Sequence, residues 1–122
     1  MEHRAYHMAM LYDFYGELLT DRQREFFDLY HQQDLSLAEI AEQYHISRQG
    51  VRDIILRAEH TMTEVENKTR LIQRFHRMQT ELAALDQATE ELALYAAAHD
   101  QEGRLSGIVQ TIRNHTARLK QE

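Results

Sequence analysis

The 122-residue sequence contains no proline, no cysteine and no tryptophan, and only four glycines. Without proline, few positions forbid a helix from continuing, and 43% hydrophobic residues supply enough apolar surface for packing. The absence of cysteine excludes disulfides and any thiolate metal or nucleophile site, and it agrees with a reducing compartment. These absences predict an all-α chain.

Long apolar runs are also missing. No run approaches the roughly 20 residues that a membrane-spanning helix needs, and the start "MEHRAYHMAM" lacks the basic-then-apolar layout of a signal peptide. We therefore expect a soluble, cytoplasmic protein without membrane insertion.

Positive charge is scarce, with 14 lysines and arginines against 20 acidic residues and a net charge of −6. Such a balance disfavours binding of a polyanion by the whole surface. Any nucleic-acid binding is expected to use one face of one helix.

The sequence offers no catalytic motif. Of its eight histidines, only His3 and His7 have the i, i+4 spacing of a helical metal pair, and no carboxylate completes a set with them. No nucleophile motif or glycine-rich phosphate loop is present. We predict no enzyme activity, no metal site and no cofactor.

Residues 5 to 19 predict an N-terminal helix. Its apolar stripe follows the i, i+3, i+4, i+7 pattern and is interpreted as core: Leu11, Phe14, Tyr15 and Leu18. The tyrosines of this segment are assigned to packing rather than to base stacking: Tyr6, Tyr12 and Tyr15.

A second helix is expected over residues 21 to 32. Thr20 followed by Gln23 has the spacing of a capping box, which predicts the start of the helix. This helix should bury three aromatic side chains: Phe26, Phe27 and Tyr30.

Two further helices are expected close together. Ser36 and Glu39 form a second capping box before a helix over residues 37 to 44, and Ser47 can cap the next helix. The turn between them is too short for antiparallel stacking, so the pair predicts a helix-turn-helix. His45 is the candidate for the positive φ of that turn.

The fourth helix divides into a buried and an outward face. The buried stripe is Val51, Ile54, Ile55, Ala58 and Met62, and Ile46 can pack on Val51 as a hydrophobic staple. The candidate nucleic-acid-binding residues are Ser47, Arg48, Gln49, Arg52 and Arg57.

Those outward residues suit different contacts. Arg48 and Arg52, one turn apart beside the helix N-terminus, suit phosphate oxygens, and Gln49 suits adenine. Asp53 on the same face opposes phosphate binding, and its simplest role is an ion pair with Arg57. Gly50 has no assigned role.

The C-terminal half has a heptad pattern. Apolar or small residues recur in steps of three and four: Leu71, Phe75, Met78, Leu82, Leu85, Thr89, Leu92 and Ala96. "HDQEGRL" breaks this seam before a second amphipathic run that can fold back. Because the returning helix is shorter than the seam, we expect a homodimer, although the seam can also be satisfied within one chain. Basic residues cluster at the start of the long helix and can extend a nucleic-acid-binding patch: Lys68, Arg70, Arg74 and Arg77.

The stretch "SLAEIAEQYHISRQGVRDI" resembles region 4 of bacterial sigma factors, with "EIA", "SR" and "VR" in the usual places. The longer string from Leu11 to Val51 is more similar to the YlxM family of small sigma-region-4-like proteins, including "LYDFYGELLTDRQ" and "DLSLAEIA". After Gln49 the sequence departs from the YlxM pattern at Gly50, Arg52 and Ile54. Only Arg48 and Arg52 carry over from sigma factors, as phosphate contacts.

The YlxM resemblance implies a helical accessory or regulatory protein of the signal recognition particle that contacts the particle's RNA or its GTPases. The alternatives are a dimeric DNA-binding transcriptional regulator and a protein-docking module. We expect a sigma-region-4-like helix-turn-helix domain over residues 1–62, with an N-terminal packing helix. Residues 63–122 are expected to form a long helix and a shorter returning helix.

Overall fold

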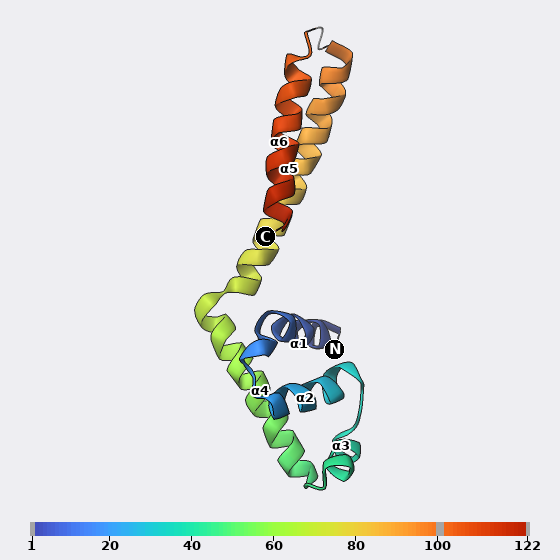
Figure 1. The fold of residues 1–122 in the computed structure, drawn as a ribbon, viewed down its shortest axis with the longest axis vertical. Coiled ribbons are helices and arrows are strands. Elements are labelled where there is room, and N and C mark those ends of the chain that lie inside the picture. Colours follow the sequence, from blue (N-terminus) through green and yellow to red (C-terminus); the bar gives the residue numbers. More distant parts are fainter. Residues whose placement is uncertain (1, 100–101, 122) are drawn as a thin grey trace. The chain divides into compact units, whose positions relative to one another are not determined.

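The computed structural model describes residues 2–99 and 102–121, apart from the side chain of Glu2. This part of the chain is helical and contains no strand, which confirms the all-α prediction (Figure 1). The elements in order are α1 (Glu2–Tyr15), η1 (Gly16–Leu18), α2 (Asp21–Phe27), η2 (Asp28–Gln32), α3 (Leu37–Tyr44), α4 (Arg48–Thr69), α5 (Leu71–His99) and α6 (Arg104–Gln121).

The chain forms two compact units, Met1–Ile72 and Gln73–Glu122. Helix α4 continues past Met62 to Thr69, where Arg70 ends it in the left-handed conformation with φ 54°. The predicted division into a helix-turn-helix domain that ends at residue 62 and an extension that starts at residue 63 stays a prediction.

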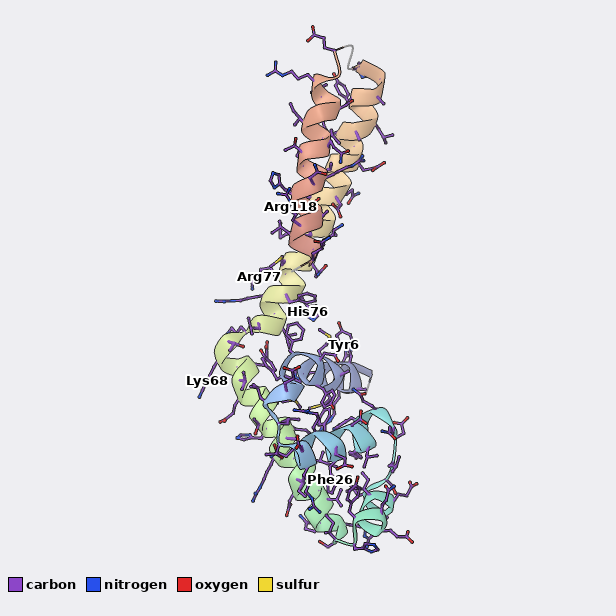
Figure 2. The ribbon with its side chains drawn as sticks, viewed as in Figure 1. Tyr6, Phe26, Lys68, His76, Arg77 and Arg118 are labelled. Atoms are coloured by element: carbon purple, nitrogen blue, oxygen red, sulfur yellow. The ribbon has the colours of Figure 1, made fainter. Side chains whose placement is uncertain are left out.

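The first unit has two hydrophobic clusters. One joins α1 to the second half of α4 and includes Leu11, Phe27 and Met62, all fully buried. The other holds α2, α3 and the start of α4 together through Phe26, Ile40 and Val51, also fully buried. Figure 2 shows Phe26 among these helices. Burial of α4 on both clusters fixes which of its faces remains open.

Part of the predicted N-terminal stripe is wrong. Leu11 and Tyr15 are buried and Phe14 is partly buried, but Leu18 is 61% exposed and Leu19 is buried instead. The α-helix ends at Tyr15 and tightens into the 3-10 turn η1, so the spacing of a continuous α-helix no longer applies. Tyr6, which was assigned to packing, is 58% exposed.

The second helix begins as predicted and ends differently. Both hydrogen bonds of the Thr20–Gln23 capping box are present. After Phe27 the helix widens into the π-helix η2, and the N–H of Gln33 donates to the carbonyl of Asp28. This change of register leaves Tyr30 37% exposed, so its predicted burial is wrong.

The second unit is a helical hairpin, because α6 runs back along α5 (Figure 1). Gly103 lies just before α6 with φ 77°, a conformation that favours glycine. Arg113 of α6 pairs with Glu90 of α5 at 3.0 Å, and Lys120 pairs with Asp86. The predicted returning helix is therefore present.

Candidate nucleic-acid interface

The helix-turn-helix consists of α3, a tight turn and α4. Ser36 and Glu39 form both hydrogen bonds of the predicted capping box, each 3.1 Å long. His45 ends α3 in the left-handed conformation, with φ 57° and ψ 42°, and its N–H donates to the carbonyl of Ala41. Ser47 then caps α4, because its Oγ accepts from the N–H of Gly50 at 2.9 Å. These local bonds fix the direction of α4 as it leaves the turn.

The packing around this cap gives Gly50 a role. A Cβ atom at Gly50 would lie 3.2 Å from Ser47 Oγ and 3.8 Å from Ile46 Cδ1. Ile46 and Val51 belong to the same hydrophobic cluster, as the predicted staple requires. The glycine therefore leaves room for the serine cap beside the staple.

The candidate residues extend from the N-cap of α4 through the first half of the helix, and all are exposed: Ser47, Arg48, Gln49, Arg52 and Arg57. At about 100° per residue, Arg48 and Arg52 share one edge of the solvent-exposed side of α4, and Arg57 lies toward the other edge. Gln49 and Asp53 lie between these edges. The first turn of α4 contains no acidic residue, so Arg48 and the N–H groups that the Ser47 cap leaves unused have no competing carboxylate on that turn.

Asp53 has a different partner from the one predicted. Its carboxylate accepts a hydrogen bond from Gln49 Nε2 at 2.9 Å, and within residues 2–99 and 102–121 no ion pair joins it to Arg57. Gln49 and Arg57 each lie one turn from Asp53, on opposite sides along the helix, so they compete for the same carboxylate. The pairing orients the Gln49 side chain and keeps a negative charge in the middle of the face.

A cleft of about 170 Å³ borders the Arg52 edge. Arg4 and Tyr30 also line it, together with Leu56 and Glu59 of α4. Glu59 is only 8% exposed, and its carboxylate pairs with His31 Nε2 at 2.7 Å and more distantly with Arg4 at 3.7 Å. The sequence did not indicate Arg4, His31 and Glu59, because they are brought together from three separate helices and no local spacing signals their contact.

Helix α3 adds negative charge beside the turn. Hydrogen bonds from the backbone and the side chain of Ser36 hold the pKa of the Glu39 carboxyl below its ordinary value. Glu39 therefore remains ionised at neutral pH, and Glu42 on the same helix is exposed. Attraction for a polyanion must come from α4 rather than from α3.

Lys68, one of the other predicted basic residues, lies far from the cap of α4. Lys68 is twenty residues after Arg48 on the same helix, which corresponds to about 30 Å at 1.5 Å per residue. Figure 2 shows Lys68 extending away from α4 and Arg77 extending away from α5. Lys68 and Arg70 belong to the first unit, and Arg74 and Arg77 belong to the second. Within the first unit, the basic residues predicted to bind nucleic acid therefore form two separate groups, one in the first half of α4 and one at the end of that helix.

Two features are absent from the described residues. None of the helices there is long and apolar enough to cross a membrane. The same part of the chain holds no group of three or more histidine, aspartate or glutamate side chains arranged to bind a metal ion.

Comparison with known proteins places this arrangement in a family. Residues 1–101 match the family described as "Putative helix-turn-helix protein, YlxM / p13 like". A UPF0122 protein of Desulforamulus reducens is 53% identical over 66 residues, which cover 54% of this chain and 56% of that protein. The aligned part is thus little more than half of that relative's length.

Two other relatives align over a longer part. A UPF0122 protein of Thermoanaerobacter sp. is 46% identical over 83 residues, covering 68% of this chain and 71% of the relative. A UPF0122 protein of Bacillus thuringiensis is 46% identical over 84 residues, covering 69% and 76%. The chain belongs to the YlxM/p13-like family of helix-turn-helix proteins, UPF0122.

Proposed function

We propose that this protein is a nucleic-acid-binding accessory protein of the signal recognition particle pathway, and that the N-terminal end of α4 makes the contact. The main support is the pair Arg48 and Arg52, which are exposed on adjacent turns beside the N-terminus of a capped helix. Guanidinium groups and helix N-terminal amides are both common phosphate ligands in proteins. We place the protein in the cytoplasm and assign it no enzymatic activity.

The RNA of the particle is the ligand we propose, and its GTPases are the proposed protein partners. Family membership supports a regulatory role for the helix-turn-helix. The resemblance to YlxM proteins implies the association with the signal recognition particle. Arg48 and Arg52 support binding to a phosphate backbone more than reading of base edges. Asp53 in the middle of the face repels phosphates and accepts only from donors such as the cytosine amino group.

A DNA-binding regulator resembling region 4 of sigma factors is the second candidate. The tight turn and the exposed Gln49 favour it, since a helix entering the major groove can present a glutamine to adenine. The hydrogen bond to Asp53 occupies one N–H of that glutamine. A glutamine has a second N–H and a carbonyl oxygen, so the pairing restricts this contact without preventing it.

Dimerisation is part of both candidates. The seam from Leu71 to Ala96 is covered unevenly by α6: Leu82 is 3% exposed and Leu85 is 47% exposed. A homodimer held by the hairpin would give each assembly two copies of α4.

Binding to three ligands tests the proposal: the particle's RNA, a duplex DNA of random sequence and the particle's GTPase. We expect the RNA to bind most tightly and Arg48→Ala/Arg52→Ala to weaken it. Arg22→Ala is the control, because it removes an exposed arginine that is not one of the proposed contact residues. Arg22 belongs to α2 and lies over the Phe26 ring at 5.2 Å. Tight binding to a duplex selected from the random-sequence DNA, without binding to the RNA or the GTPase, would replace the first candidate with the second. Binding that survives the double substitution would show that the proposed face is wrong under both.

A further inference from the structure

The heptad seam of α5 consists of two rows, and α6 covers one of them. The covered row lies at seven-residue intervals: Leu82 is 3% exposed, Thr89 is 6% exposed and Ala96 is 2% exposed. In the other row, Met78 and Leu85 are each 47% exposed, and Leu92 is half-buried. One side of the seam is therefore used within the chain, and the other side is open.

Helix α6 repeats the same division. Val109 and Thr116, seven residues apart, are buried against α5. A second row consists of half-buried Leu105 and Ile112 and of Leu119, which is 44% exposed. Ile108, 45% exposed, lies beside this row.

The two open rows lie on the same side of the hairpin. On each helix, residues of the open row lie three residues after or four residues before a buried residue, which places the row about 40° to 60° to one side of the contact. Because the helices are antiparallel, these equal rotations point to the same face. We call this the open face; its apolar residues are Leu85, Leu92, Leu105, Ile108, Ile112 and Leu119.

The buried layer between α5 and α6 is thin. It contains two threonines and one alanine, and Leu82 and Val109 are its larger apolar members. Two helices with so little apolar burial gain little from packing, and tertiary packing supplies most of the stability of helices in proteins. The larger apolar side chains lie on the open face, where a second helical layer would bury them.

Charge indicates which helices would form that layer. From Glu81 to His99, α5 has no lysine or arginine, and its acids are Glu81, Asp86, Glu90 and Glu91. Helix α6 has no acid, and its bases are Arg104, Arg113, Arg118 and Lys120. Asp86 and Glu90 already pair with Lys120 and Arg113 of the same chain, so the charges available to a second copy are those of Glu81, Glu91, Arg104 and Arg118. A second copy of this hairpin supplies a matching apolar face together with the opposite charge for each helix.

We propose that two copies of this chain pack their open faces together as a four-helix bundle, with α5 of each chain against α6 of its partner. The inference rests on the proposed homodimer and specifies its interface. A two-fold axis parallel to the helices gives this pairing and places the two acidic helices diagonally. A two-fold axis across the helices would instead pack α5 on α5 and bring like charges together, which is unfavourable.

The interface is tested with two leucines of α5 that are both exposed in the hairpin. Leu85 lies on the open face, and Leu94, 67% exposed, lies on the opposite side of the same helix. In sedimentation at tens of micromolar, we expect Leu85→Glu to raise the dimer dissociation constant at least about tenfold, because it buries a carboxylate in the bundle. Leu94→Glu should leave the dimer intact.

Circular dichroism of both variants checks that the helices are retained. A monomeric wild-type protein would overturn the proposal, as would a dimer that survives Leu85→Glu or is equally weakened by Leu94→Glu. Sedimentation needs no nucleic acid, so loss of this interface is distinguishable from failure of the binding proposal.

The pairing of α5 with α6 is tested by cross-linking, since the natural chain has no cysteine. Lys120 pairs with Asp86, so Leu85 and Leu119 lie at similar heights along the hairpin. We expect a disulfide-linked dimer when the separate variants Leu85→Cys and Leu119→Cys are mixed and oxidised. Efficient self-linking of Leu85→Cys alone would show α5 packed on α5 and overturn the proposed arrangement.

Discussion

Gln49 donates a side-chain hydrogen bond to Asp53 over 2.9 Å, across one turn of α4. The pair lies between the Arg48–Arg52 edge and Arg57, in the middle of the proposed contact face. The carboxylate therefore orients the residue best suited to contact a base and opposes the phosphates that the arginines attract. The face is suited to limited, position-dependent contact rather than to unrestricted binding of polyanions.

Removal of this charge should strengthen binding to nucleic acid. For Asp53→Asn, we expect affinity for the particle's RNA to rise by up to about fivefold at low salt, because one exposed charge contributes about 1 kcal/mol or less. Fluorescence anisotropy of labelled RNA measures the change. Glu64→Gln is the control, because Glu64 is an exposed acid further along α4 that pairs with His60. Unchanged or weaker binding by Asp53→Asn would argue against a phosphate ligand at this face.

The Ser47 cap and Gly50 should show coupled effects on stability. Ser47→Ala removes the hydrogen bond to the Gly50 N–H and should lower the free energy of unfolding by about 0.5 to 2 kcal/mol. Gly50→Ala should gain less than the roughly 1 kcal/mol of helix propensity, because the new methyl group would crowd Ser47 Oγ. When Ser47 is already replaced by alanine, Gly50→Ala should stabilise the protein more than it does in the wild type. Urea unfolding of the wild type, the two single variants and the double variant measures these effects. Additive changes in the free energy of unfolding would contradict the proposed crowding.

Tyr15 connects α1 to the end of α4. Its hydroxyl donates to Glu66 Oε1 at 2.6 Å and lies 2.7 Å from Thr69 Oγ1. Burial, followed by the hydrogen bond to Glu66, raises the pKa of Tyr15 above its ordinary value of 10.0. The backbone N–H of Ile72 also donates to Glu66, at 3.0 Å, so this carboxylate joins three segments of the first unit.

This raised pKa predicts a loss of stability at alkaline pH. The folded protein holds the Tyr15 proton more tightly than the unfolded chain, so the stabilisation is complete below about pH 10 and declines as pH rises through the folded pKa. Tyr15→Phe should cost about 1 to 3 kcal/mol at neutral pH and should make the decline less steep. Urea unfolding at a series of pH values measures both effects. Tyr12 and Tyr44 also have raised pKa values, so part of the decline should remain.

The sequence predicted the elements that depend on local hydrogen bonds. The capping boxes of Thr20 and Ser36 and the cap of Ser47 need only residues within one helical turn, and all three form. The left-handed conformation of His45 was predictable for the same reason, since the short turn required a positive φ at that place.

The errors arise where helical periodicity changes or where distant segments compete. Leu18 and Tyr30 were placed by the spacing of an ideal α-helix, and each lies in or just after a change to a 3-10 or π turn. Local sequence could not choose between Gln49 and Arg57 as the partner of Asp53, because both are one turn away. The contact between His31 and Glu59 joins residues 28 positions apart and requires the assembled fold.

The salt dependence of binding to the particle's RNA tests most directly whether Arg48 and Arg52 contact phosphates. If Arg48 and Arg52 each contact a phosphate, Arg48→Ala/Arg52→Ala should reduce the slope of log affinity against log salt by about 2, and Arg22→Ala should leave it unchanged. We expect this selective loss of slope together with weaker binding. A wild-type slope in Arg48→Ala/Arg52→Ala, with affinity retained, would contradict it.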